Sequence, residues 1–247
     1  MNFFYFQYLI DILSFFMDFM MDNNIEDKLG RFLLMSIFSG LFMAHILSMI
    51  NQYWDSGGGF FWRLDFYAQL CSTLFMGFFF YYTVHRLPPQ NCASGVIPRI
   101  VAIGGTFLMM FLVALPPEQV GPVRDLISAV LTIAGTTLSI WCLIQLGRSF
   151  SIMATARELK TRGSYAIVRH PLYAAELLMM TGIMLGHGSP FAFAMGAVWL
   201  PLQICRAHFE ERVLRKTFPD YEDYAARVPM LIPLMSWHWR APVKQGI

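Results

Sequence analysis

The sequence predicts an all-α protein whose helices form a polytopic transmembrane bundle. Of its 247 residues, 56% are apolar and 14% are charged, and the mean hydropathy is +0.50, whereas soluble domains carry about 25% charged residues. The apolar residues fall in long runs, and a membrane span needs ~20 of them. Helices are expected because a bilayer tolerates no open sheet edge. The composition excludes a soluble globule and a disordered chain, and a net charge of +2 gives no basis for nucleic-acid binding.

The N-terminal part, residues 1–29, contains an apolar stretch at 3–21 that Asp11 and Asp18 interrupt. This stretch either lies in the membrane interface, which we favour, or forms a seventh span. It has no positively charged region before it and no small-residue cleavage site, so it is not typical of a signal peptide.

The second part, residues 30–146, is predicted to be a four-span membrane body. His45 lies inside its first span and is expected to hydrogen-bond between helices rather than to bind a ligand. The four apolar runs that predict the spans are 30–50, 64–84, 98–115 and 124–146.

The third part, residues 147–247, contains two shorter apolar runs, 172–187 and 190–205. Only Gly188 and Ser189 separate them, and so short a link predicts an antiparallel helical hairpin. The polar residues of the chain concentrate in this third part. A catalytic site is therefore expected in residues 147–247, on the side of the membrane where the loops of this part lie.

The distribution of Lys and Arg predicts that side. With six spans in alternating directions, all of the 18 basic residues except Arg63 and Arg124 fall on one side. Cytoplasmic loops carry the excess of Lys and Arg in membrane proteins, so residues 148–169 and the C-terminal tail are predicted to be cytoplasmic. We expect a bacterial inner membrane, and the endoplasmic reticulum stays open as an alternative.

The first group of polar residues, at 163–173, reads G-x-Y-x-x-x-R-H-P-x-Y. Pro171 precedes an apolar helical run, where its missing N–H would have no helical partner in any case. His170 is therefore predicted at the start of a helix, beside unpaired N–H groups and the positive end of the helix dipole. An ordinary loop-to-helix junction with Arg, His and Tyr anchors in the membrane interface would give the same residues, so this alternative stays open.

Two further groups follow. Arg206 and Glu210 lie four residues apart, so they share a helix face and can pair. A snorkelling arginine followed by a solvated acidic turn would look the same. The third group, at 218–229, has two tyrosines on one helical edge and is typical of a short amphipathic tail on the membrane surface.

No metal site is expected. The cysteines, Cys71, Cys92, Cys142 and Cys205, form no C-x-x-C pair, and His208 has no partner at metal-ligand spacing. The cysteines are interpreted as small buried side chains.

Taken in this order and spacing, the three groups resemble the isoprenylcysteine carboxyl methyltransferase family, to which membrane methyltransferases of phospholipids and small thiols are similar. The resemblance covers residues 146–233, about a third of the chain, and the earlier spans carry none of it. Ala175 departs from the family pattern, which often has Gly there. The residues that carry the resemblance are Gly163, Tyr165, Arg169, His170, Pro171, Tyr173, Arg206, Glu210, Glu211, Leu214, Phe218, Tyr221, Tyr224, Val228 and Pro229.

The resemblance implies a methyltransferase that takes its methyl group from S-adenosylmethionine without a Rossmann fold, and the sequence indeed has no Gly-rich phosphate loop. Residues 147–247 would form the methyltransferase core: a donor-binding loop, the hairpin at 172–205 and the amphipathic tail. Arg206 would hold the acceptor, and Arg206 and Glu210 would be the catalytic residues. The donor-binding residues that it implies are Arg157, Glu158, Leu159, Lys160, Tyr165, His170, Pro171, Leu172, Tyr173 and Glu210.

The chemistry of Arg206 ranks the acceptors that this resemblance leaves open. A guanidinium clamps a carboxylate, which is already a nucleophile at neutral pH. A thiol must first lose its proton, although its pKa would fall beside Arg206. An amine is better served by an acidic site. We therefore expect a lipophilic or membrane-accessible acceptor, with a carboxylate first, a thiol second and an amine third, and membrane lipids as the other partners.

Two other classes stay open. A membrane-bound, NADPH-dependent reductase of sterols or related lipids has a similar helical layout, but the basic stretch at 157–162 is thin for the phosphates of a dinucleotide. A non-enzymatic transporter usually places ionisable residues in the middle of the membrane. In this sequence they gather at one face instead.

Overall fold

The computed structural model describes residues 25–55, 64–115 and 117–233, so the apolar stretch at 3–21 lies outside the described residues. The described part is mostly helical, as the sequence predicts. Its α-helices are α2 (Ile25–Asp55), α3 (Leu64–Val84), α4 (Val96–Phe107), α5 (Pro122–Leu146), α6 (Pro171–His187), α7 (Pro190–Thr217) and α8 (Tyr221–Arg227), and its 3-10 helices are η2 (Leu108–Ala114), η3 (Gly147–Ser149) and η4 (Gly163–Ala166).

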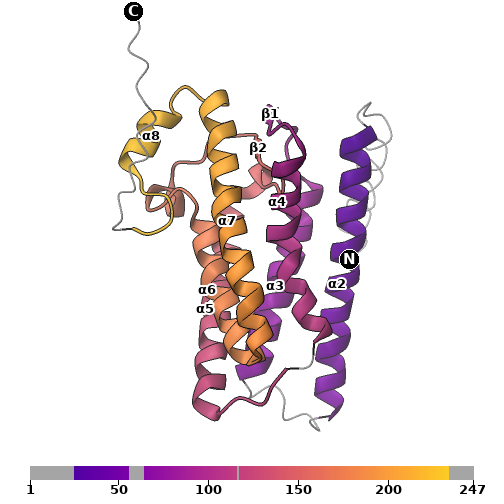
Figure 1. Ribbon diagram of the computed structural model, residues 1–247. Coiled ribbons are helices and arrows are strands. Elements are labelled where there is room, and N and C mark those ends of the chain that lie inside the picture. Colours follow the sequence, from indigo (N-terminus) through magenta and orange to yellow (C-terminus); the bar gives the residue numbers. More distant parts are fainter. Residues whose placement is uncertain (1–24, 56–63, 116, 234–247) are drawn as a thin grey trace, which may run out of the picture.

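The long helices lie side by side and run in alternating directions along the chain (Figure 1). Helix α5 packs between α3 and α6, α4 packs on α7, and α2 packs on α3 at the edge of the bundle. Helix α8 and the loops after α3, α5 and α7 all lie at one end of the bundle. The basic loops of the predicted cytoplasmic side are therefore at a common end.

The predicted span at 98–115 is not a single α-helix. The chain is α-helical through α4 and then winds into the tighter η2 from Leu108. Leu115 has an extended backbone (φ −105°, ψ 139°), as expected of a residue before a proline, which disfavours the helical region for its predecessor. The run is apolar throughout, and hydropathy alone does not distinguish α from 3-10 winding.

One helix of the described part, Pro122–Ser149, is long and apolar enough to cross a membrane, and Met35–Asn51 and Val96–Leu112 are shorter apolar helices. The number of spans therefore remains a prediction. Helix α5 nevertheless has the residue distribution of a membrane helix, because it buries small side chains and exposes large apolar ones. Its buried residues include Ser128, Ala129, Thr132, Gly135, Thr136 and Ser139, and its exposed ones include Val123, Leu126, Val130, Leu138 and Trp141.

Helices α5 and α6 pack so closely that the backbone of one lies against the backbone of the other. A Cβ atom at Gly182 would lie 2.7 Å from the backbone nitrogen of Thr132, and one at Gly135 would clash with the backbone of Met179. The hydroxyl of Ser128 donates a hydrogen bond to the carbonyl of Gly182 (2.8 Å). Glycines on both helices thus permit a contact that any side chain would prevent.

The two short apolar runs of the third part form α6 and α7. Gly188 between them has the left-handed conformation (φ 79°), and the Ser189 hydroxyl caps α7 by accepting a hydrogen bond from the backbone of Ala192 (3.3 Å). Helix α7 does not end near residue 205 but continues to Thr217, because the next helix-breaking residue is Pro219. Arg206 and Glu210 accordingly lie within α7 and not after it.

A pair of two-residue strands is the exception to an all-helical fold in the described part. Strand β1 (Asn91–Cys92) pairs antiparallel with β2 (Thr155–Ala156), with Asn91 opposite Ala156. The pair ties the loop after α3 to the loop after α5, at the end of the bundle where α8 lies (Figure 1).

Candidate active site

A cavity of about 430 Å³ lies inside the bundle, with walls from α2, α3, α4, η2, α6, α7, α8 and the loop between α5 and α6. Its apolar end is lined by side chains such as Phe75, Met109 and Ile183. Its polar end lies where α6 begins and the second half of α7 passes. Apart from tyrosines, the ionisable and amide side chains that line the whole cavity are His45, Lys160, Arg169, His170, Glu176, Gln203, Arg206 and Glu210.

The loop between α5 and α6 is fixed to the end of α5. The side-chain carbonyl of Gln145 accepts hydrogen bonds from the backbone N–H (2.7 Å) and the hydroxyl (3.0 Å) of Ser164. Tyr165 is buried, and its carbonyl accepts a hydrogen bond from the hydroxyl of Tyr224 (2.6 Å). Burial raises the pKa of Tyr224 to about 12, so this hydroxyl stays protonated and remains a donor.

Arg169 holds the C-terminal segment against the start of α6. Its Nε donates to the carboxylate of Glu211 (2.7 Å), and its Nη1 donates to the carbonyls of Ala225 (2.7 Å) and Val228 (3.0 Å). The side chains of Arg169 and Glu211 are 8% and 4% exposed. We call these contacts the tail clasp. They give Arg169 a structural role, although its side chain also lines the cavity.

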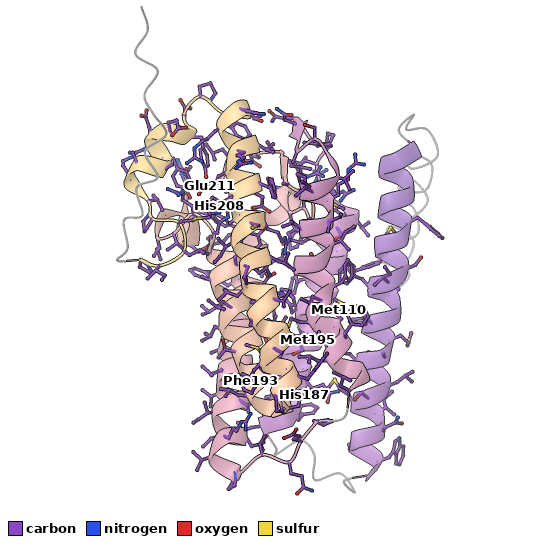
Figure 2. All side chains as sticks on the ribbon, in the orientation of Figure 1. Met110, His187, Phe193, Met195, His208 and Glu211 are labelled. Atoms are coloured by element: carbon purple, nitrogen blue, oxygen red, sulfur yellow. The ribbon has the colours of Figure 1, made fainter. Side chains whose placement is uncertain are left out.

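Glu211 is a buried carboxylate that stays charged. Burial alone would raise its pKa, but hydrogen bonding and attraction from His170, with the charges of Arg169 and Arg215, lower the pKa to about 2. Arg215 adds an ion pair at 3.0 Å. Figure 2 shows Glu211 and His208 toward the end of α7 beside α8, with Phe193 near the opposite end.

His170 lies at the start of α6, as the sequence predicts, and Pro171 follows it in the first turn. Its backbone N–H donates to the carbonyl of Met230 (3.0 Å). Its ring stacks on Tyr173, with centroids 5.5 Å apart and planes 10° apart. The two ring nitrogens lie 3.7 Å from a Glu210 oxygen and 3.4 Å from a Glu211 oxygen. His170 therefore joins the tail clasp to the polar end of the cavity.

Arg206 and Glu210 both line the cavity but do not form an ion pair with each other. Tyr173 lies between them: its hydroxyl donates a short hydrogen bond to Glu210, and the Arg206 guanidinium lies over its ring, 5.0 Å from the centroid. The ion pair that their spacing allows is thus replaced by contacts of each residue with Tyr173 of α6. Arg206 is 7% exposed and donates instead to Gln203 (2.8 Å) and to the carbonyl of Ile152 (3.3 Å).

Glu176 is a cavity residue that the sequence reasoning missed. Its carboxylate accepts a hydrogen bond from the amide of Gln203 (3.1 Å), and the carbonyl of the same amide accepts from Arg206. The signal was available, because an acidic residue inside a predicted apolar span is costly and commonly functional. The rule that singles out Arg206 and Glu210 holds equally for Glu176, which lies inside the apolar run at 172–187.

The structure brings together seven of the ten residues implied for donor binding. The other three do not line the cavity: Arg157 is buried beside the strand pair, where its carbonyl accepts from Gln90 (2.6 Å), Glu158 is exposed and pairs with Lys160 (2.8 Å), and Pro171 serves as the first residue of α6. The seven that line it are Leu159, Lys160, Tyr165, His170, Leu172, Tyr173 and Glu210.

Three further cavity residues carry hydroxyls without hydrogen-bond partners among the described residues. They are Ser151, Thr155 and Tyr221. A buried polar group left unpaired costs about 1–3 kcal/mol, so these hydroxyls are suited to a polar ligand. Tyr221 belongs to the third group of the sequence, whereas Ser151 and Thr155 carry no sequence signal. His45 also lines the cavity, and its Nδ1 has no partner in the described part, so the predicted interhelical bond is not seen at that atom.

Residues 123–221 match the phospholipid methyltransferase family. This range contains α6, α7 and the loop before them, which build the polar end of the cavity. The match covers less than half of the chain and leaves out α2, α3 and α4.

The chain is also similar to curated proteins. It is 32% identical over 111 residues to protein-S-isoprenylcysteine O-methyltransferase B of Arabidopsis thaliana, covering 42% of this chain and 56% of the relative. It is 27% identical over 117 residues to the nickel-cobalt-cadmium resistance protein NccN of Alcaligenes xylosoxydans xylosoxydans, covering 44% and 52%. It is 30% identical over 99 residues to the cobalt-zinc-cadmium resistance protein CzcN of Cupriavidus metallidurans, covering 39% and 43%.

The family match and the Arabidopsis relative confirm the resemblance to the isoprenylcysteine carboxyl methyltransferase family. The chain spans about half the length of the curated relatives it matches. Among the residues that the structure describes, no group of three or more His, Cys, Asp and Glu side chains is placed to hold a metal ion.

Proposed function

We propose that this protein is an integral membrane methyltransferase that transfers a methyl group from S-adenosylmethionine to a lipophilic acceptor. The observation that carries the proposal is the cavity. Its polar end gathers seven of the ten residues implied for the donor together with Arg206, and it continues without interruption into an apolar end. A single space can therefore hold a polar donor beside an apolar acceptor.

The residues of the polar end suit the donor. When bound, S-adenosylmethionine supplies an electrophilic methyl group on a positively charged sulfur. The carboxylate of Glu210 and the ring of Tyr173 favour a cation, and the start of α6 favours an anion such as the donor carboxylate. The unpartnered hydroxyls of Ser151, Thr155 and Tyr221 offer hydrogen bonds to the remaining polar groups.

Arg206 is the residue that suits the acceptor. It lines the cavity, and its Nε has no hydrogen-bond partner among the described residues. One donor of the guanidinium is therefore left for an anionic group. Taken alone, this favours the carboxylate acceptor that the sequence ranks first, with a thiol second.

The arrangement of the helices supports a cytoplasmic active site in a multi-pass protein. The polar end of the cavity lies at the end of the bundle that carries α8 and the basic loops. The exposed apolar face of α5 suits contact with lipid chains.

The test is transfer of labelled methyl groups by the purified protein from S-adenosylmethionine to a membrane extract, with identification of the product. We expect a labelled lipophilic product. The protein should also melt at a higher temperature with S-adenosylmethionine or its demethylated product than without. Stabilisation by NADPH in place of both, with no labelled product, would favour a reductase and overturn the proposal.

A further inference from the structure

We propose that Glu176 accepts the proton of the methyl acceptor while Arg206 holds the anion that remains, which makes the acceptor a thiol. This rests on the proposed function, and it assigns a role to a residue outside the ten implied for the donor and outside the pair implied for catalysis.

Glu176 is placed to receive a proton. It lies on α6, one turn after Tyr173, and its side chain lines the cavity. Its carboxylate accepts one hydrogen bond, from Gln203, and no basic side chain of the described part lies within ion-pair distance of it. The rest of its hydrogen-bonding capacity is left for a ligand, since an ionised carboxylate has about four acceptor sites.

Gln203 fixes the relation between Glu176 and Arg206. Its amide NH₂ donates to Glu176 (3.1 Å), and its amide oxygen accepts from Arg206 (2.8 Å). Both ends of the amide are thus committed. A carboxyl group and a guanidinium therefore face the same cavity, held apart by a neutral bridge.

With Glu176 in the ionised form that a base needs, Glu176 and Arg206 together discriminate between acceptor groups. A carboxylate would be attracted by Arg206 and repelled by Glu176 and Glu210. An amine in its charged form would be attracted by the two glutamates and repelled by Arg206. A thiol is uncharged when it enters and separates into a proton, which Glu176 takes, and a thiolate, which Arg206 stabilises. Ranked with Glu176 included, a thiol comes before a carboxylate.

The proposed step balances. The S–H bond of the acceptor breaks, its proton goes to the Glu176 carboxylate, and its electron pair stays on sulfur. The thiolate then forms a bond to the methyl carbon as the bond between that carbon and the donor sulfur breaks, and that electron pair returns to the donor sulfur. The Glu176 proton passes to water after the product leaves.

The test uses octanethiol, octanoate and octylamine, which share a chain length and differ in the reacting group. We expect the unaltered protein to methylate octanethiol in preference to the other two. Glu176→Gln, which keeps the shape and removes the base, should lose about 100-fold in rate at neutral pH, the low end of what a general base contributes. The rate should recover as the pH rises, because solvent then ionises the thiol.

Glu118→Gln is the matched control, since Glu118 lies in the exposed loop before α5 and outside the cavity. It should keep the rate and the pH profile of the unaltered protein. Binding of S-adenosylmethionine, measured by calorimetry, should be the same in all three proteins.

The outcomes separate the two proposals. Absence of donor binding and of any methylation would remove the proposed function itself. Donor binding with preferential methylation of octanoate or octylamine would overturn only the thiol assignment, and this comparison needs no variant. A folded Glu176→Gln protein with the rate and pH profile of the unaltered one would overturn the role of Glu176.

Discussion

Tyr173 connects Glu210 and Arg206, two residues of α7 that line the cavity. Its hydroxyl binds Glu210, and its ring supports the guanidinium of Arg206. The two residues of α7 that the sequence paired directly are therefore coupled through a side chain from α6. A change at either of them alters the contacts of Tyr173, so folding has to be measured together with activity in every variant of this group.

Replacing Arg206 should separate acceptor binding from donor binding. We expect Arg206→Ala to lower the rate by orders of magnitude with nearly unchanged affinity for S-adenosylmethionine, measured by kinetics and calorimetry on the same preparation. Arg206→Lys should recover only part of the rate, because a point charge cannot reproduce the planar fork of a guanidinium. Arg212→Ala, an exposed position on the same helix, is the control. An Arg206→Ala protein that is folded and fully active would leave Arg206 as a structural residue.

The charge of Glu211 should make stability depend on pH in the acid range. Its folded pKa of about 2 lies below the unfolded value of about 4.3, so the unfolded state binds more protons. The stabilisation is complete above about pH 5 and is lost as the pH falls toward 2. At neutral pH, Glu211→Gln should be less stable by about 3 kcal/mol, and the difference should narrow in acid.

Melting in detergent from pH 2 to 7 (about one point per half unit) measures this dependence. Glu222→Gln removes an exposed carboxylate that also pairs with Arg215 and should leave the curve nearly unchanged. Parallel curves for Glu211→Gln and the unaltered protein would show that the tail clasp does not depend on this charge.

At the scale of elements, the contact between α5 and α6 depends on glycine. We expect Gly182→Ala to lower stability by about 1–3 kcal/mol, because the added methyl would meet the backbone of both Thr132 and Ser128 and neither can move without its helix. Thermal melting in detergent measures the loss. Gly40→Ala on α2 is the control, since nothing lies within 4 Å of its Cβ position and alanine favours a helix. Equal melting temperatures for the two variants would contradict the close contact.

The elements themselves could be predicted well where one physical signal decides them. The apolar run at 64–84 and the bounds of α3 coincide, and the Gly188-Ser189 link does separate two helices. The change to η2 and the extension of α7 to Thr217 could not be predicted from apolar runs, because 3-10 winding does not change hydropathy and the last part of α7 is polar yet still helical.

At the scale of the molecule, the site combines segments that are far apart in the chain, and this limits what spacing can reveal. Arg169 belongs to the spacing that resembles methyltransferases, and in the structure it binds the C-terminal segment. Spacing in the sequence does not connect Glu176 with its hydrogen-bond partner, because Gln203 is 27 residues away. The hydroxyls of Ser151 and Thr155 can be recognised as candidate ligand-binding groups only from the structure, which shows that both residues line the cavity.

The orientation of the whole molecule can be tested through Cys92. This exposed cysteine lies in β1, at the end of the bundle that is predicted to face the cytoplasm. A membrane-impermeant maleimide should label it in inverted vesicles and not in intact cells, with Cys92→Ser as the control for labelling at other cysteines. Labelling in intact cells would place this end, and the active site with it, on the opposite side of the membrane.

The tail clasp also has a consequence for biosynthesis. The carbonyls that fix Arg169 come from residues 56 and 59 positions later in the chain, so they leave the ribosome well after α6 does. A nascent chain that already contains α6 lacks the contacts that order the polar end of its cavity until α8 and the residues after it have emerged. A translation arrest between α7 and α8 would therefore yield a chain that contains α6 and α7 but lacks the tail clasp, and on the proposed function we expect that chain to be inactive.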